Sequence, residues 1–286
     1  GIPFKTLDLE KEYKQGVIDY MLEEYTAGRT PNPDVMCNKV VKFGAFLDWA
    51  LSEGADYIAT GHYAENIDNT LVKGFDDNKD QSYFLWTLTS EQLKHILFPI
   101  GHMEKPEVRK LAKKYDLITA DKKDSQGLCF IGDIEMRDFL KHFIDTEKGD
   151  VLNKDGKVIG EHEGALLYTI GQRHGFTITQ KTPTETPYFV QSKNVENNTI
   201  VVTHLGVRLP NSNRLVLENV NWISGNSPKS KIEARIRYRG KLFIGEIIEE
   251  KGAYVLVSDD IPNSVASGQS VVLYDGNTCL GGGVIQ

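Results

Sequence analysis

Cysteine is scarce in this sequence, and the number and spacing of the cysteines argue against two classes of protein. Three cysteines occur in 286 residues, an odd and small number that argues against a disulfide framework and for a reducing cytoplasm. No Cys-x-x-Cys or His-x-x-x-His spacing is present, which disfavours a metal-binding protein built on Cys37, Cys129 and His62 or His102. We therefore expect no permanently bound metal.

Long hydrophobic runs are also missing. No apolar stretch approaches the roughly 20 residues that a membrane-spanning helix needs, and the first residues show no signal-peptide pattern. With 40% hydrophobic and 26% charged residues, the composition is typical of a globular protein. We expect a cytoplasmic protein without a membrane partner.

A phosphate-binding glycine loop is the third absence. Neither a P-loop ending in Lys-Ser/Thr nor a Gly-rich turn between a first strand and a helix is found. The glycines at 281–283 follow strand-like sequence and precede no helix, so we interpret them as a bend at a strand end. The sequence does not begin with Met. We expect residues 1–8 to form a short strand.

The formal net charge of -7 is not typical of a nucleic-acid-binding protein, although a local basic face can bind phosphate on an acidic molecule. Arg235, Arg237 and Arg239 alternate along a predicted strand and would share one face of it. Because like charges repel, this pattern favours a phosphate-binding face.

Helical and strand periodicity alternate in the first hundred residues, which is typical of an α/β domain with a parallel sheet. Ligands bind such sheets beyond the carboxyl ends of the strands, where Gly61 and His62 would lie. Helices are predicted at 9–27, 39–51 and 79–88, a buried parallel strand at 55–62, and a mobile polar loop at 66–78.

The rest of the chain changes from helical to strand periodicity. A hairpin at 149–159 with an Asp155-Gly156 turn belongs to a small α+β unit. The last part holds five or six short strands separated by turns, which favours a small closed β-barrel. We predict three domains: 1–100, to which the loop 120–133 contributes, then 101–204, and 205–286.

The segment Asn32-Pro33-Asp34-Val35-Met36-Cys37-Asn38 combines a rigid turn, a carboxylate and a thiol. It precedes the predicted helix 39–51, so Cys37 would lie at a helix N-terminus, where the helix dipole favours a thiolate. The alternative is that Asp34 only caps the helix and Cys37 is a small buried hydrophobic residue.

A second thiol lies in a Gly-flanked turn after two lysines, within Lys122-Lys123-Asp124-Ser125-Gln126-Gly127-Leu128-Cys129. Two cysteines in polar loops fit a pair of catalytic thiols better than two core residues. Cys279 lies in the strand-rich end and is expected to take no part in the chemistry.

Five blocks of the sequence carry a resemblance to a known family. They are Gly28 to Asn38, Ala59-Thr60-Gly61-His62-Tyr63, Asn78 to Leu85, Gly127-Leu128-Cys129-Phe130-Ile131-Gly132 and Tyr168-Thr169-Ile170-Gly171-Gln172-Arg173. In this order they closely resemble the bacterial tRNA-specific 2-thiouridylase family, whose members replace O2 of the anticodon wobble uridine with sulfur. The resemblance implies an ATP-using PP-loop domain, a central tRNA-binding domain and a C-terminal β-barrel.

The resemblance also assigns binding residues. It implies nucleotide contact at Gly61, and ATP, with Mg2+ expected beside it, as the cofactor. The family binds ATP phosphates with a Ser-Gly-Gly-x-Asp-Ser loop near its N-terminus, so we expect this sequence to begin after that loop. Residues expected to contact the tRNA or its base are Asn32, Pro33, Asp34, His62, Lys79, Asp80, Gln81, Arg237, Tyr238 and Gln269.

The mechanism that the resemblance implies has two halves. ATP adenylates the uridine oxygen, and a sulfur nucleophile then displaces AMP. Cys129, with lysines nearby, would carry the sulfur as a persulfide supplied by a cysteine desulfurase or a relay protein. Cys37 would be the second thiol, a Cys37–Cys129 disulfide a plausible product, and Asp34 a proton-transfer group.

Two alternatives remain beside this one. A tRNA-binding module without catalysis would explain the basic strand and the missing glycine loop. A redox dithiol protein would share the cysteine pair but has no use for a basic barrel.

Overall fold

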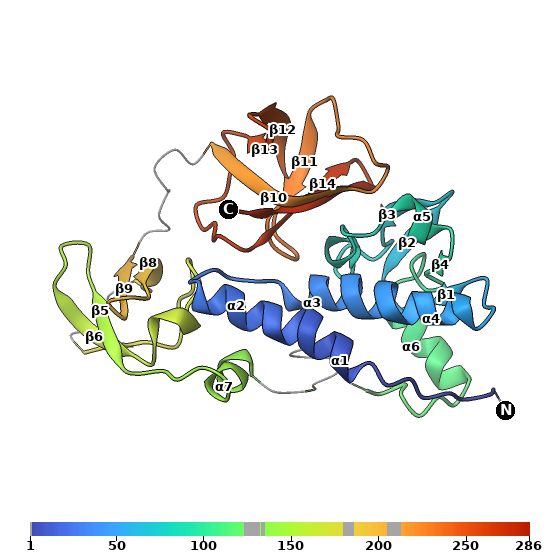
Figure 1. Ribbon diagram of the computed structural model, residues 1–286, viewed down its shortest axis with the longest axis horizontal. Helices are drawn as coiled ribbons and strands as arrows, with labels where there is room; N and C mark the ends of the chain where they lie inside the picture. The colour runs from blue at the N-terminus through green and yellow to red at the C-terminus, as the bar shows by residue number, and fades with distance from the viewer. Residues whose placement is uncertain (1, 123–131, 133–134, 180–185, 205–212) are drawn as a thin grey trace.

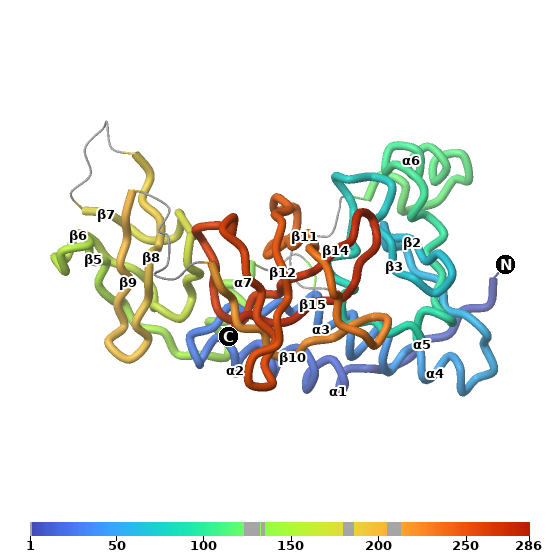
Figure 2. The backbone as a smooth tube through the Cα atoms, turned by 90° about the horizontal axis from the view of Figure 1, so that it is seen from above, coloured from blue at the N-terminus to red at the C-terminus, as the bar shows by residue number. Residues whose placement is uncertain are grey.

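The computed structural model describes residues 2–122, 132, 135–179, 186–204 and 213–286. Figures 1 and 2 show helices and short strands of residues 46–120 at one end, a β-sheet unit at the other, and a barrel of residues 213–286 between them. The helix of residues 10–26 runs beneath the barrel toward the β-sheet unit. The barrel lies over two long helices. The predicted succession of a parallel-sheet α/β domain, a small central domain and a C-terminal β-barrel is confirmed.

The two long helices each contain a π-helical middle. The first runs through α1 (Glu10–Tyr13), η1 (Lys14–Asp19) and α2 (Tyr20–Thr26), as predicted. The second runs through α3 (Pro33–Met36), η2 (Cys37–Ala45) and α4 (Phe46–Ser52). They pack closely at Gly16, where an added Cβ would lie 2.5 Å from Cγ1 of Val40, so a glycine permits this approach.

The second helix begins earlier than predicted, at Pro33 rather than Lys39. Asn32 is its N-cap, and the Asn32 side chain accepts a hydrogen bond from the backbone N–H of Val35 at 3.3 Å. Proline suits the first helical position because its missing N–H would have no partner there. Cys37 therefore lies one turn inside the helix and not at its N-terminus.

The parallel sheet consists of β1 (Ile58–Ala59) and β4 (Ile96–Leu97), so the predicted strand at 55–62 is confirmed but shorter. The predicted strand at the start of the chain is wrong, since residues 2–9 form no regular structure. They pair with no strand of the described chain, and an extended segment without a partner is not a strand.

The predicted mobile loop at 66–78 is also wrong, because a hairpin of β2 (Ala64–Ile67) and β3 (Thr70–Lys73) lies there. Asp68 and Asn69 form its turn with φ of 50° and 63°, the left-handed conformation that two-residue hairpins require. The helix expected at 79–88 is a single turn, η3 (Ser82–Phe84). Two further helices follow, α5 (Ser90–Leu93) and α6 (Lys105–Lys114).

The central lobe is a five-stranded sheet in the order β7-β6-β5-β9-β8, covered by α7 (Met136–Lys141). Its hairpin turns at Gly156, with φ of 78°, as predicted. The remaining elements are β5 (Gly149–Leu152), β6 (Val158–His162), η4 (Ala165–Leu167), β7 (Thr177–Ile178), β8 (Phe189–Asn194) and β9 (Thr199–Thr203).

The C-terminal lobe is a closed six-stranded barrel in the order β10-β13-β12-β11-β14-β15, with β15 pairing back to β10. Closure removes the exposed edges that an open sheet would leave. The strands are β10 (Arg214–Trp222), β11 (Ile232–Arg235), β12 (Phe243–Glu250), β13 (Ala253–Val257), β14 (Ser270–Asp275) and β15 (Thr278–Ile285). Because β11 ends at Arg235, the prediction that three arginines share one strand face is wrong.

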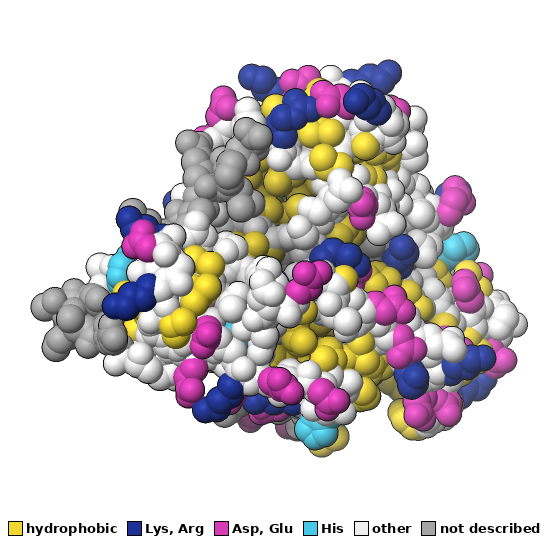
Figure 3. Space-filling view, turned by 60° about the vertical axis from the view of Figure 1, so that its left-hand side comes forward, with side chains coloured by type: hydrophobic (Ala, Val, Ile, Leu, Met, Phe, Trp, Pro, Cys, Tyr) yellow, Lys and Arg dark blue, Asp and Glu magenta, His cyan; other side chains and the backbone are white. Residues whose placement is uncertain are grey.

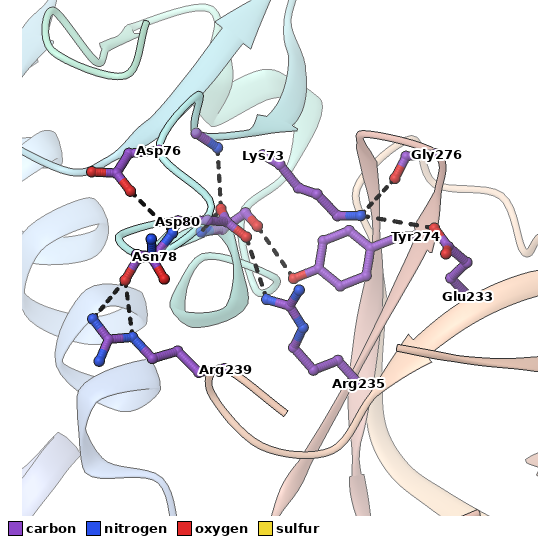
Figure 4. A network of polar contacts seen from close by, with 11 residues as sticks. Lys73, Asp76, Asn78, Asp80, Glu233, Arg235, Arg239, Tyr274 and Gly276 are labelled. Atoms are coloured by element: carbon purple, nitrogen blue, oxygen red, sulfur yellow. Dashed lines mark hydrogen bonds and ion pairs between the residues drawn. The ribbon is translucent and has the colours of Figure 1, made fainter. Parts of the chain in front are cut away.

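Asp80 joins the first domain to the barrel (Figure 4). Its side chain is 3% exposed, and Oδ1 accepts hydrogen bonds from the N–H groups of Gly74 and Ser82 at 3.1 and 3.0 Å. Its other oxygen, Oδ2, lies 3.4 Å from Nη1 of Arg235. These bonds draw residues 74–82 into a tight turn, which explains why no long helix forms there.

We predict that Asp80→Ala lowers the free energy of unfolding by about 3 kcal/mol, because it leaves a buried guanidinium and two N–H groups without their acceptor. Urea unfolding measures this loss, with the exposed Asp77→Ala as the matched control, expected within about 0.5 kcal/mol of wild type. Equal midpoints for both variants would show that the Asp80 carboxylate does not hold the two domains together.

Candidate RNA-binding and catalytic site

All three domains meet at the loop that precedes α3. The N–H of Thr30 donates to the carbonyl of Ser267 in the barrel at 2.8 Å, and its hydroxyl bonds that of Thr169 in the central domain at 3.2 Å. Gly268 faces this loop with φ of 88°, and an added Cβ would lie 2.8 Å from the Thr30 nitrogen. The loop is therefore clamped between the other two domains.

Arg237 makes a second link across the same junction. Its Nη2 donates to the carbonyl of Ile170 at 3.1 Å and to that of Ser264 at 2.7 Å, which joins the central domain to the barrel. Burial lowers the pKa of this guanidinium, an expected cost of withdrawing a charge from water. Arg237 is thus held in place by backbone carbonyls and does not project freely into solvent.

A small cavity of about 140 Å³ opens between these links. Four residues predicted to contact RNA line it together, although they come from two domains: Asn32 from the first, and Arg237, Tyr238 and Gln269 from the barrel. Within the described part of the chain, Nε of Arg237 and Oε1 of Gln269 are buried without a hydrogen-bond partner. Both atoms are enclosed by protein, so they belong to polar side chains packed at the cavity wall and are not groups open to a ligand.

The lining also includes Pro31, Tyr83 and Ser270, which were not predicted to contact the RNA. Tyr83 is a buried core aromatic that borders the cavity. Its place next to Phe84 in a buried segment gives no signal of this role. Only the barrel packed against it reveals the hydroxyl's partners, the carbonyls of Ile236 and Ser270.

Asp34 and Cys37 come after the cavity-lining Asn32 in the sequence, on the helix that begins at Pro33. Pro33 and Asp34 form the first turn of α3 and are half-buried. Cys37 is 1% exposed and packs in a small apolar cluster with Val17 and Val41, between the two long helices. Cys129, the predicted partner thiol, lies outside the described residues.

Cys279 is buried in the core shared by the first domain and the barrel. Burial raises the pKa of its thiol to about 12, so it stays protonated and unreactive at neutral pH. Cys37 and Cys279 are not joined by a disulfide.

The Lys79-Asp80-Gln81 block does not form one exposed patch. Besides Asp80 in the interface, Gln81 accepts a hydrogen bond from the N–H of Tyr63 at 3.0 Å through Oε1. Lys79 lines a separate cavity of about 500 Å³ whose other charged residues are Asp76, Glu104, Lys105 and Arg109.

Gly61 and His62 follow β1 at its carboxyl end, as predicted, but differ in exposure. Gly61 is exposed, and the nearest atom to an added Cβ would be Cδ1 of Ile100 at 3.9 Å, so a ligand can approach its backbone. His62 is buried beside Phe43 and Phe98, with ring centroids 5.6 and 6.0 Å away. Its Nδ1 lies 2.8 Å from the Thr60 hydroxyl.

On the face drawn in Figure 3, Lys and Arg side chains are interspersed with Asp and Glu. Arg235, Arg237 and Arg239, which were predicted to share one strand face, each bind protein groups. Arg239 donates through Nε to the carbonyl of Asn78 at 2.9 Å.

The described residues contain no cluster of three or more His, Cys, Asp or Glu suited to a metal ion. Among the same residues, no helix is long and apolar enough to cross a membrane.

Acidification should unfold the protein partly through His62. Burial, with a smaller effect of Lys42, lowers the pKa of His62 from 6.5 to about 3. The unfolded chain then binds a proton that the folded chain excludes, so stability is full above pH 6.5 and falls as the pH drops toward 3.

We predict that lowering the pH from 7 to 5 costs the wild type about 2 kcal/mol more than it costs His62→Gln, measured by urea unfolding at both values. Replacing the exposed His142 by Gln is the control and should leave the pH dependence unchanged. Identical pH dependence in wild type and His62→Gln would contradict the buried, neutral state of His62.

Comparison with known families agrees with the three lobes. Residues 1–133 match the family described as tRNA methyl transferase HUP domain, residues 137–204 the tRNA methyl transferase PRC-barrel domain, and residues 212–285 the aminomethyltransferase beta-barrel domain. The HUP match implies ATP binding.

Relatives named tRNA-specific 2-thiouridylase MnmA match along nearly the whole chain. One from Hydrogenovibrio crunogenus is 46% identical, covering 99% of this chain and 78% of its own length. Those from Francisella philomiragia and Aeromonas salmonicida are 45% and 44% identical, covering 100% of this chain and 82% and 80% of their own lengths. The chain belongs to the MnmA family of tRNA-specific 2-thiouridylases.

Proposed function

We propose that this protein transfers sulfur, in an ATP-dependent reaction, to C2 of the wobble uridine (U34) of tRNA. The observation that carries the proposal is the cavity at the domain junction, where Asn32, Arg237, Tyr238 and Gln269 come together from distant parts of the chain. The relatives' printed name supports the reaction type, a tRNA-uridine 2-sulfurtransferase.

The target uridine is stacked in the anticodon loop and must be turned out before its base can react. The junction cavity brings together side chains of the kinds that bind such nucleotides: Tyr238, whose ring packs against Phe84 with centroids 4.6 Å apart, and the polar side chains of Arg237 and Gln269. Pro33 and Asp34, the next residues after Asn32, would line the path from this cavity toward the reacting atom. Lys79 and His62 remain proposed contacts to the RNA.

Activation of the base requires ATP as a co-substrate, because a carbonyl oxygen is a poor leaving group. O2 of the uridine attacks the α-phosphate, pyrophosphate leaves, and the base becomes an adenylated intermediate. Gly61, exposed beyond β1, suits close approach of the nucleotide to the backbone. Mg2+ is expected to accompany ATP. Nothing in the described residues marks the group that holds the phosphates.

Sulfur delivery would use the two thiols. The terminal sulfur of a Cys129 persulfide attacks C2, and AMP departs with the former O2. Cys37 then attacks Sγ of Cys129, which breaks the S–S bond, leaves sulfur on the base and joins the two cysteines as a disulfide. An external thiol must reduce that disulfide before the next cycle. A cysteine desulfurase or a relay protein would supply the persulfide sulfur, and Asp34 would hold or move the accompanying proton.

The burial of Cys37 adds a requirement. Its thiol is 1% exposed among Val17 and Val41, so attack on Cys129 requires the helices around it to separate when RNA binds. Until the helices separate, burial keeps the thiol away from solvent oxidants.

Thiolation of unmodified tRNA by the full-length protein, with ATP and a persulfide donor, tests the proposal. We predict that Cys37→Ser and Cys129→Ser each lower 2-thiouridine formation at least about 100-fold while tRNA affinity stays within about 2-fold. Cys279→Ala is the matched control and should keep the wild-type rate, because its thiol is buried and protonated.

Two outcomes would contradict the proposal. Full activity of Cys37→Ser or of Cys129→Ser would remove that cysteine from the mechanism. A wild-type protein that binds tRNA but forms no 2-thiouridine would instead be a tRNA-binding module without catalysis.

A further inference from the structure

A second cavity, of about 500 Å³, lies where the segment after β3 meets the start of α6. Among the residues that the structure describes, none lines both this cavity and the junction cavity. We call it the charged cavity, because its lining holds the carboxylates of Asp76 and Glu104 and the cationic side chains of Lys79, Lys105 and Arg109. Three cations from two separate segments therefore converge on one cavity.

The carboxylate of Asp76 helps to build the charged cavity. Its Oδ1 accepts the N–H of Asn78 at 3.0 Å, and its Oδ2 accepts the N–H of Lys105 at 3.1 Å. The single acid within α6, Glu107, accepts the N–H of Glu104 at 3.2 Å. These bonds join the loop to the first turn of the helix, so the three cations are held around a defined cavity.

The positive charge continues along α6. Five of its ten residues are Lys or Arg and none of the ten is buried, whereas the chain as a whole has a formal net charge of -7. Lys105, Arg109 and Lys113 follow one another at intervals of four residues, so they lie along one face over about 12 Å. A solvated helix face would explain this row alone. It would not explain Lys79, which a different segment brings to the same cavity.

The charged cavity is connected to the wall of the junction cavity. Tyr238 lines the junction cavity, and the next residue, Arg239, donates through Nε to the carbonyl of Asn78 at 2.9 Å (Figure 4). Asn78 in turn lines the charged cavity. An RNA with a base in the junction cavity therefore has its backbone near Lys79 and the start of α6.

We propose that Lys105 and Arg109, together with Lys79, bind RNA phosphates that flank the target base. Lysine attracts a phosphate as a point charge, and arginine can bond two of its oxygens at once. A row of cations over about 12 Å suits a chain of phosphates better than the single triphosphate of ATP. The inference rests on the proposed function, because it takes the tRNA as the ligand.

Two double variants of the full-length protein test the inference. Lys105→Gln/Arg109→Gln removes two charges from the charged cavity. Lys154→Gln/Lys157→Gln removes two charges from the exposed turn between β5 and β6, at the opposite end of the molecule from α6 (Figure 1). The net charge changes equally in both. Because none of the four side chains is buried, both variants should keep the wild-type midpoint of thermal unfolding.

The measurement is the affinity for an anticodon stem-loop RNA between about 50 and 200 mM salt. We expect Lys105→Gln/Arg109→Gln to weaken binding about 10-fold at the lowest salt and to reduce the slope of log Kd against log salt by about 1.5. The loss should be equal for RNAs with U34 and with C34, because phosphate contacts do not read sequence. Lys154→Gln/Lys157→Gln should keep the wild-type slope.

Three results would overturn the inference. The first is an equal salt slope for the two double variants. The second is a weaker affinity of Lys105→Gln/Arg109→Gln for ATP with unchanged RNA binding, which would assign the cavity to the nucleotide. The third is unchanged RNA binding with slower thiolation from a protein persulfide donor but not from a small-molecule persulfide, which would assign α6 to docking of that donor.

The same experiment separates this inference from the proposed function. If the wild type binds the RNA without thiolating it, the catalytic proposal fails, while a different slope for Lys105→Gln/Arg109→Gln still supports the phosphate contacts. If the wild type thiolates the RNA and the slopes of the two double variants agree, only the phosphate contacts are wrong.

Discussion

Hydrogen bonds between the loop before α3, the barrel and the central domain hold the candidate site together. Thr30 binds Ser267 on one side and Thr169 on the other, and Arg237 joins Ser264 to Ile170. Each bond alone is worth about 1 kcal/mol, somewhat more where a charge takes part. Their importance lies in geometry, since they hold three domains together beside one small cavity, whose walls come from the first domain and the barrel.

The buried polar residues of this fold fall into two groups. Asp80 and His62 are polar but buried, and their hydrogen bonds and packing serve the structure of the first domain and its joint with the barrel. Arg237 and Gln269 are held by the same interface yet keep a buried polar atom without a partner in the described chain. An unpaired buried donor or acceptor costs stability, and at this junction the two atoms belong to side chains that also line the cavity.

Local patterns predicted much of the fold. The helix at 9–27, the Asp155-Gly156 hairpin and the barrel strands follow from periodicity and turn residues, and the structure has them close to their expected bounds. The hairpin at Asp68-Asn69 was missed because the polar and acidic residues of 66–78 were interpreted as one loop, although two residues that tolerate positive φ mark its turn. The one-turn η3 could not be foreseen, since it depends on Asp80 binding backbone groups and Arg235.

The site was predictable by resemblance and not by physical pattern. The family resemblance named Asn32, Arg237, Tyr238 and Gln269, but nothing in their spacing shows that they line one cavity. The alternating arginines predicted a phosphate-binding face. In the structure β11 ends at Arg235, so the three do not share a strand face, and each guanidinium bonds a protein group. The place of Tyr83 at the cavity was not predicted, because the carbonyls that its hydroxyl binds are distant in the sequence and meet it only in the folded chain.

The most direct measurement of this account is amide hydrogen exchange in Arg237→Met. If the junction acts as a unit, exchange should accelerate about 10-fold together at Thr30, Gly171 and Gly268, which lie in three domains, while β5 and β9 stay protected. Arg239→Met, which removes an exposed guanidinium from the same turn, should leave all three unchanged. Faster exchange confined to the barrel around residue 237 would contradict the view that this contact holds the three domains around one site.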